Sequence, residues 1–373
     1  MLEKGKISKG QFMILIFLFM IGSSTLIATP MVINQAKQDG WISGFMALGF
    51  GLILVRIYGS LAKHHPNETL IEICQSILGK WLGKFVAFLY FLFFLILTSG
   101  LVRIIGDLIT TKIMTETPMI AIEIAFIIIV IYGVYLGLET FARTAEMVLP
   151  WVLMFFILVM LSLIPEIEMK NILPILDGGF NPSIRGTYRL MGIPYLDIVI
   201  FLMISPYVVN SVKIGKELFI STFVGGTLLT CVITLAIVVL GTELSSKLNY
   251  PLFDLAQRID IGNFIQRIEV LSGGIVFIAM FIKIVISYYS MILSLAQILE
   301  LKKFNILSIP LGILVLTFSL FLFPNIIYFQ MFTNDVWTPF SFIYGFFFPL
   351  LLLIVDIMKR KIGSLNRRPK RLL

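Results

Sequence analysis

The stretch MIGSSTLIATPM, from Met20 to Met31, lies in the middle of the first apolar segment of the chain. A helix that only crosses a bilayer needs about 20 mostly apolar residues and gains nothing from Gly, Ser and Pro near its centre. These residue types interrupt a helix or allow an unusually close approach of its backbone. The stretch therefore predicts a break at residues 22–25, inside a segment otherwise long enough to span a membrane.

Composition indicates an integral membrane protein. Of the 373 residues, 58% are hydrophobic, 13% are charged and 33 are Phe, which is more apolar surface than a soluble core of this size can bury. The first apolar run is too long for a signal peptide and has no convincing cleavage site, so we expect a retained helix. The two cysteines do not indicate a disulfide framework.

Hydropathy predicts an all-α protein with ten membrane spans, short connections and no soluble domain. With ten spans, most of the 29 Lys and Arg residues fall on the side of the two termini, so the positive-inside rule predicts cytoplasmic termini. The net charge of +8 reflects this bias and a basic tail over 359–373, and we expect no nucleic-acid partner. The spans are expected at 11–36, 40–62, 84–110, 118–138, 147–165, 187–210, 216–241, 267–299, 305–324 and 336–358.

Two connections are expected to form surface helices. Apolar residues at helical spacing over 67–84 predict one amphipathic helix on the cytoplasmic interface, with Trp81 on its apolar face. Mixed apolar and charged residues over 250–269 predict a surface helix or lid on the opposite side. The basic tail is also expected to attract anionic membrane lipid.

A second break is predicted in the sixth span. The segment RLMGIPYLDIVIFLMISPYV, from Arg189 to Val209, contains Gly192 and Pro194 about a third of the way in. Interrupted segments at matching places in two halves indicate a transporter built from inverted repeats. Unwound backbone is tolerated in a membrane where it lines a cavity, and half-helix ends can hold a carboxylate and an amine. A small zwitterion such as an amino acid fits; the alternative is that Gly and Ser only permit close packing.

The candidate ligand-binding residues come from these breaks and from the spans expected beside them. Asp197 and Lys283 fall near the midplane, where a charge is costly and therefore a functional candidate. They either pair directly or hold opposite ends of a ligand. The remaining candidates are Gly22, Ser23, Ser24, Thr25, Gly192 and Pro194 at the breaks, and Phe93 and Leu97 on a face of the third span shared with Tyr90 and Phe94.

Other charged residues inside spans are expected to be structural. Arg103 and Asp107 lie four apart near the end of the third span, and Glu123 on the fourth span can reach Arg103. Asp356 lies beside Lys359 and Arg360 at a membrane boundary and is expected to have no special role. For any single aromatic residue in so Phe-rich a chain, ordinary core or lipid packing is the alternative to a place in the pocket.

Six short motifs are spread along the chain: GSSTLIATP (22–30), DGW (39–41), LGKWLGK (78–84), RTAEMVLP (143–150), NILPILDGG (171–179) and QRIEVL (266–271). Together they resemble the B subunits of GerA-type spore germinant receptors, members of the amino acid, polyamine and organocation permease superfamily. The resemblance implies a LeuT-like fold, a single polytopic membrane domain over 1–373 with inverted five-helix repeats. The repeats are placed at 11–165 and 187–324, with the ninth and tenth helices at 305–324 and 336–358.

The resemblance also implies a function. Such a subunit senses a small germinant, usually an amino acid, sugar or nucleoside, beside an A-type membrane subunit and a C-type lipoprotein in the spore inner membrane. In the implied fold, spans 1, 3, 6 and 8 surround the ligand, and Lys283 can stand in for the sodium ion of many relatives. Ser23, Ser24 and Thr25 occupy positions where permeases commonly have a second Gly, which leaves the identity of the ligand open.

Three functions remain open from the sequence: a ligand sensor, an amino acid permease that is proton-coupled or uncoupled, and a structural scaffold for a receptor. The paired breaks count against the scaffold. The sequence has no phosphate-binding loop, nucleophile elbow or metal-ligand cluster, and its only histidines are His64 and His65. We therefore expect no enzymatic activity, no cofactor and no catalytic metal.

Overall fold

Helices make up the regular structure of the described residues, apart from one isolated backbone pairing between Ile7 and Val208. The computed structural model describes residues 3, 5–209, 211, 214–248, 250–251 and 268–366. The main helices are α1 (Lys9–Ile21), α2 (Ser24–Ala36), α3 (Gly40–His64), α4 (Leu70–Leu78), α5 (Lys80–Lys112), α6 (Met119–Tyr135), α7 (Leu138–Ser162), α8 (Phe180–Leu190), α9 (Gly215–Lys247), α11 (Ile268–Ile298) and α12 (Ser308–Leu322). The last helix runs continuously through α13 (Ile326–Met331), α14 (Thr338–Phe342) and α15 (Phe348–Asn366), with two wider π-type turns between them.

Seven helical stretches within the described residues are long and apolar enough to cross a membrane. They begin at Ser24, Lys80, Leu138, Gly215, Val276, Asn305 and Ile326. The helices α1 and α6 are apolar but shorter, and α2 and α3 are counted as one stretch because only a 3-10 turn separates them. The chain is therefore a multi-pass helical membrane protein, and the number of ten spans stays a prediction.

Both predicted breaks are present in the backbone. The helix α1 ends at Ile21, Gly22 leaves the helical conformation, and α2 begins at Ser24. In the second half, α8 starts at Phe180, earlier than the predicted 187, and its axis breaks at Met191–Tyr195, where Ile193 has extended dihedral angles. A 3-10 segment, Leu196–Leu202, continues beyond this break. Each break leaves helix ends in the interior of the bundle.

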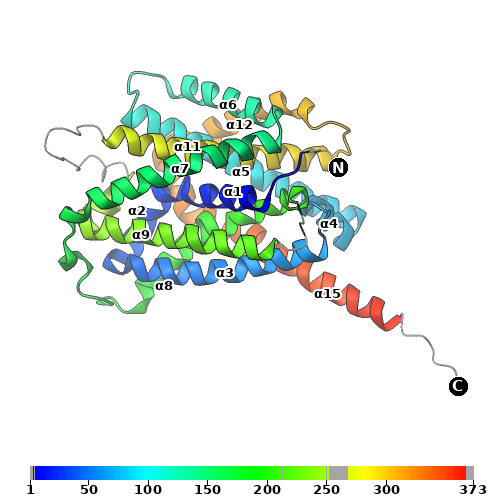
Figure 1. Cartoon of the computed structure of the whole chain (residues 1–373), viewed down its shortest axis with the longest axis horizontal. Coiled ribbons are helices and arrows are strands. Elements are labelled where there is room, and N and C mark those ends of the chain that lie inside the picture. Colours follow the sequence, from blue (N-terminus) through cyan, green and yellow to red (C-terminus); the bar gives the residue numbers. More distant parts are fainter. Residues whose placement is uncertain are drawn as a thin grey trace.

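The broken helix α1–α2 lies at the centre of the bundle (Figure 1). The helices α9, α7 and α11 pack around α1, and residues Leu15–Ile21 of α1 are all buried. At one edge of the bundle, α6 exposes Ile120, Ile124, Ile128 and Tyr132, which recur every four residues on one face. An apolar stripe on the periphery of a membrane bundle is suited to contact with lipid.

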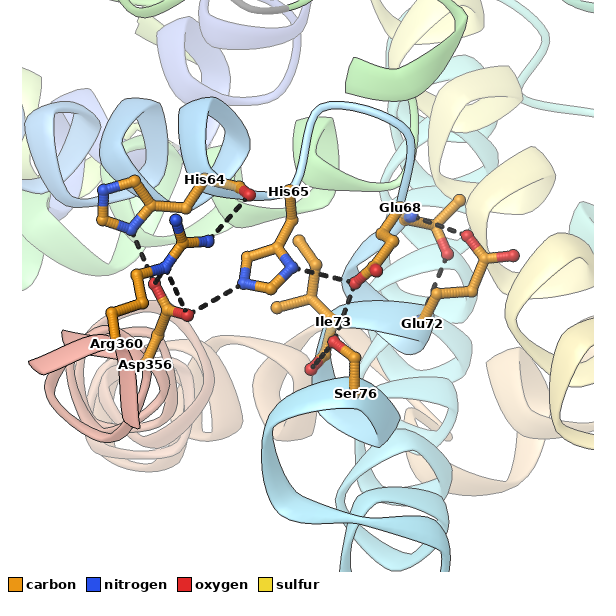
Figure 2. Close-up of polar contacts among 9 residues, drawn as sticks. His64, His65, Glu68, Glu72, Ile73, Ser76, Asp356 and Arg360 are labelled. Atoms are coloured by element: carbon orange, nitrogen blue, oxygen red, sulfur yellow. Dashed lines mark hydrogen bonds and ion pairs between the residues drawn. The ribbon is translucent and has the colours of Figure 1, made fainter. Parts of the chain in front are cut away.

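The end of the bundle that carries α4 and the amino terminus is the predicted cytoplasmic end, called the inner end below. There, His64 Nδ1 contacts Asp356 Oδ2 at 2.6 Å and His65 Nε2 contacts Asp356 Oδ1 at 3.2 Å (Figure 2). Arg360 Nε donates to both oxygens of the same carboxylate at 2.9 Å. Asp356, expected to have no special role, thus ties α15 to the turn between α3 and α4.

The amphipathic helix predicted over 67–84 is present only over Leu70–Leu78, and its predicted continuation to residue 84 is wrong. The segment forms the short helix α4 and the first turn of α5, because Gly79 between them has φ +85°, a conformation that ends a helix. The apolar side of α4 is buried against the protein, including Ile73 and Cys74, whereas Trp81 on α5 is 89% exposed. The surface helix predicted over 250–269 lies almost entirely outside the described residues.

Close contact between α3 and α9 depends on Gly59. A Cβ atom added at Gly59 would lie 2.9 Å from the Cα atom of Gly215, whereas one added at Gly49 on the same helix would meet nothing within 4 Å. We expect Gly59→Ala to reduce the unfolding free energy by about 1–3 kcal/mol through overpacking. Gly49→Ala, which has the same change in helix propensity, should be neutral or slightly stabilising. Thermal unfolding of the purified variants measures both, and equal melting temperatures would contradict this packing.

Candidate functional site

A small cavity lies between the two helix breaks. Its volume is about 30 Å³, room for one or two water molecules. The first break contributes Ser23 and Ile27, and the second contributes Ile193 and Asp197. The rest of its wall consists of Ile96, Leu97, Gly100, Leu101 and Ile104 from α5, with Phe323, Phe329, Phe332, Thr333 and Trp337 from the end of α12 and the last helix.

Lys283 contacts the first break from α11. Its side chain is fully buried, its Nζ atom donates to Ser23 Oγ at 2.7 Å, and the same atom lies 4.5 Å from the ring centroid of Phe19. A hydroxyl acceptor and an aromatic face both stabilise a buried ammonium group. A Cβ atom added at Gly22 would lie 3.3 Å from Lys283 Cβ and Cδ, so the absence of a side chain at Gly22 leaves room for the lysine stem.

Asp197 faces the cavity from the second break. Its side chain is 1% exposed, and its Oδ1 atom has no hydrogen-bond partner among the described residues. Asp197 and Lys283 are not within the 4.0 Å distance of an ion pair in the described structure, although their opposite charges attract each other. Of the two predicted arrangements, the described structure shows separated charges, with an unpartnered carboxylate oxygen beside the cavity.

The other break residues support the backbone instead of lining the cavity. The Thr25 hydroxyl donates to the Ile21 carbonyl at 3.0 Å and lies 3.3 Å from that of Gly22, next to the end of α1. Trp337 Nε1 donates to the Gly192 carbonyl at 3.2 Å, and a Cβ atom on Gly192 would lie 2.6 Å from Thr338 Oγ1. Pro194 and Ser24 are buried outside the cavity lining, and the Ser24 hydroxyl has no partner among the described residues.

The third predicted span lines the cavity with residues that lie one turn further along the helix than expected. Leu97 lines the cavity, and the lining continues toward Ile104. Phe93 lies outside the lining, stacked on Trp337 and Tyr344 at centroid distances of 5.6 and 4.8 Å. Tyr90 donates to the Tyr344 carbonyl at 2.9 Å. These aromatic residues hold the last helix against α5 and so position Trp337 at the cavity.

Sequence reasoning missed the contribution of the last helix. The predicted tenth span started at 336, but the helix begins at Ile326, where the Asn325 side chain accepts from the backbone N–H of Tyr328. Phe329, Thr333 and Trp337 recur every four residues and all line the cavity. This helical spacing after an Asn cap is the available signal, and the polar residues Thr333, Asn334 and Asp335 ahead of the predicted start hide it.

A second, larger pocket lies next to the cavity, toward the ends of α2 and α9. Its volume is about 150 Å³, and both spaces are lined by Ile27, Ile104, Phe329 and Thr333. Lys247 lines the second pocket, which therefore lies toward the predicted outer side. On the inner side, backbone hydrogen bonds join Ile7 to Tyr207 and Val209, and Lys9 contacts Glu217 at 3.1 Å. The cavity is thus closed toward the inner end and separated from the outer pocket by one shared layer of side chains.

Among the described residues, no three His, Cys, Asp or Glu side chains are grouped to hold a metal ion.

Two broken helices around a small cavity in a multi-pass bundle define the fold of a membrane transporter. The structure superposes on that of a manganese transporter from Eremococcus coleocola with a TM-score of 0.61, covering 99% of this chain and 92% of that chain at 10% identity. At this identity the comparison shows the fold alone.

The chain belongs to the family described as spore germination protein, whose model matches residues 6–326. It is 27% identical to spore germination protein KB of Bacillus subtilis, over 96% of this chain and 97% of that protein. It is 26% identical to spore germination protein XB of Bacillus anthracis, over 93% of this chain and 98% of that protein. The match confirms the resemblance to B subunits of GerA-type receptors noted in the sequence.

Lys283 should stabilise the closed site. We expect Lys283→Met to reduce the unfolding free energy on the order of 2–3 kcal/mol, because Ser23 loses its donor and the buried Asp197 loses a nearby positive charge. The double variant Lys283→Met with Asp197→Asn should recover part of this loss. Thermal unfolding in detergent measures all three proteins, with Lys247→Met, an exposed lysine, as the control. A melting temperature of Lys283→Met equal to that of wild type would contradict the role assigned to the ammonium group.

Proposed function

We propose that the protein is the ligand-binding subunit of a spore germination receptor and that it binds a small germinant, an amino acid, in the cavity between the two helix breaks. The observation that carries the proposal is the convergence of both breaks on one small cavity with separated charges. Ser23 and Lys283 lie on one side of this site and the unpartnered carboxylate of Asp197 on the other. An amino acid carries one carboxylate and one ammonium group, and this charge pattern is complementary to it.

In this proposal, the described structure is the conformation in which the ligand site is closed. A cavity of about 30 Å³ is too small for an amino acid, so a ligand enters only when the shared layer of Ile27, Ile104, Phe329 and Thr333 opens toward the outer pocket. The ligand then stabilises the conformation in which it makes better contacts. The resulting change in the populations of the two conformations is the signal. The family membership supports a role in germination, and the fold supports a ligand-dependent change of conformation.

The proposed architecture is a LeuT-like arrangement of ten spans in two inverted repeats, in the inner membrane of the spore with both termini in the cytoplasm. The charge bias of the sequence and the position of α4, the amino terminus and the end of α15 at one end of the bundle support this orientation (Figure 1). We further propose that the subunit acts without enzymatic activity, beside an A-type membrane subunit and a C-type lipoprotein. Passing on a conformational signal requires such a partner.

An amino acid permease, proton-coupled or uncoupled, is the second candidate function. The structural similarity to a solved transporter over 99% of the chain favours it, because the same broken-helix fold can move a ligand. Uptake of radiolabelled amino acids into liposomes that contain the purified protein separates the two. Saturable accumulation supports the permease, and ligand binding without accumulation supports the sensor.

Filling the cavity should weaken the germinant response. We expect Leu97→Phe to raise the germinant concentration for half-maximal germination at least tenfold, a cost of about 1.4 kcal/mol in binding, because the larger side chain occupies the ligand's space. Leu82→Phe on the exposed side of α5 is the matched control and should leave the dose–response curve unchanged. Blots of spore membranes check that both variants accumulate. An unchanged curve for Leu97→Phe would place the ligand elsewhere.

The proposed orientation predicts which lysines are accessible from outside. With Cys231→Ser as background, cysteines introduced at Lys170 and Lys247 should react with an impermeant thiol reagent on intact cells, and those at Lys80 and Lys302 should react only after the membrane is opened. Cys74 does not interfere, because it is buried and burial raises the pKa of its thiol. Labelling of Lys80→Cys on intact cells would overturn the orientation.

A further inference from the structure

Arg103, Asp107 and Glu123 form a buried charged cluster that the proposed ligand site does not use. Arg103 and Asp107 lie one turn apart on α5, and Glu123 projects from α6. The residues are 5%, 4% and 0% exposed, respectively. The sequence predicts structural roles for these residues. In the described structure Arg103 and Glu123 form a long ion pair of 3.7 Å, and the hydrogen bonds of the cluster go to Pro324, Tyr250 and Ser319.

The two carboxylates differ in the partners they have. Asp107 Oδ2 accepts a short hydrogen bond of 2.6 Å from the Tyr250 hydroxyl. Glu123 Oε2 accepts from the Ser319 hydroxyl at 3.0 Å, but Glu123 Oε1 has no hydrogen-bond partner among the described residues. Glu123 Oε1 forms an ion pair with Arg103 Nη1 at 3.7 Å, a distance that is too long for a hydrogen bond.

Arg103 is also incompletely partnered. Its Nη2 atom donates to the Pro324 carbonyl at 3.2 Å, and its Nε atom has no hydrogen-bond partner among the described residues. Among described residues, the titratable groups that act on the two carboxylates are Arg103 of α5, which attracts both, and Tyr250 beyond the end of α9, which donates to Asp107. With both carboxylates ionised, the described cluster would enclose one positive and two negative charges, which is unfavourable in a buried site.

The backbone of α5 makes room for the Glu123 carboxyl group. A Cβ atom added at Gly106 would lie 3.0 Å from both Cγ and Oε1 of Glu123, so the absence of a side chain at Gly106 lets this carboxyl group rest directly on α5. Packing against α5 therefore fixes its place together with the long ion pair to Arg103. A carboxylic acid held this way is stable when it is neutral, because its uncharged form needs fewer hydrogen bonds than a carboxylate.

We propose that Glu123 is a proton-binding site, loaded from the outer pocket, and that Asp107 supplies the negative charge that balances Arg103. Tyr250 connects the two regions, because it lines the outer pocket and donates to Asp107. A hydronium ion from water in that pocket transfers its proton to Glu123 Oε1, which leaves one water molecule and a neutral carboxylic acid. When the proton returns to water, the carboxylate attracts Arg103 and strengthens the contact between α6 and α5. Ile104, next to Arg103, lies in the layer between the cavity and the outer pocket. The proposed proton-binding site is therefore adjacent to this layer.

Infrared spectroscopy of the full-length protein in liposomes tests the proposal directly. The wild-type protein at neutral pH should show a C=O band of a protonated carboxyl group that disappears as the pH is raised, and the spectrum of Glu123→Gln should lack this band. Glu139→Gln removes a carboxylate that forms an exposed pair with Arg143 and should leave the band in place. Identical bands in wild type and Glu123→Gln would overturn the proposal, as would a wild-type spectrum without a titrating band.

Thermal unfolding distinguishes a proton site from a structural ion pair. Glutamine has nearly the shape of protonated glutamic acid, so Glu123→Gln should melt within about 2 °C of wild type at pH 7. Raising the pH should destabilise the wild type, which must release its proton, more than Glu123→Gln. Asp107→Asn should lower the melting temperature by about 5 °C or more, because it leaves Arg103 without its charged partner. A large drop for Glu123→Gln, or its failure to accumulate in the membrane, would show that Glu123 is the charged partner and overturn the proposal.

Discussion

The rest of the structure depends on how the freed backbone groups at the two helix breaks are satisfied. Inside a membrane, an unpaired carbonyl or N–H group has no water to bond, so a break persists only where side chains or a cavity receive it. Thr25 does this at the first break and Trp337 at the second, each by donating to a carbonyl next to the break. Lys283 adds a buried ammonium group beside Ser23. The two breaks therefore require polar partners beside them, and α5, α11 and the last helix meet there around one cavity.

The same helices connect this cavity to the inner surface. The last helix carries Trp337 at the cavity and Asp356 at the inner end, where Figure 2 shows both histidines bound to its carboxylate. A displacement of this helix at the cavity therefore reaches the turn between α3 and α4. Gln297 of α11 lies in the same region and accepts from Thr69 at the start of α4. A receptor whose ligand site is buried needs such continuous elements to pass on a change of conformation.

Much of the fold could be predicted from the sequence because its strongest signals are periodic and local. The apolar runs, the break at Gly22 and the break near Gly192 follow from residue type and spacing. The site was predicted less well, because its walls depend on helix rotation and on where a helix begins. Phe93 turns toward Tyr344 instead of the cavity, and the early start of the last helix, ahead of the predicted residue 336, adds Phe329 and Thr333 to the lining. The role of Gly79 in ending α4 was also missed, since a single Gly does not reveal whether its φ is positive.

The central claim is that both breaks face the ligand. A cryo-electron microscopy structure of the membrane-embedded receptor at a saturating germinant concentration tests it most directly. The account predicts density for the germinant between Ser23 and Asp197, with the layer of Ile27 and Phe329 displaced from its closed position. Germinant density elsewhere, with the cavity as small and closed as it is here, would contradict the account.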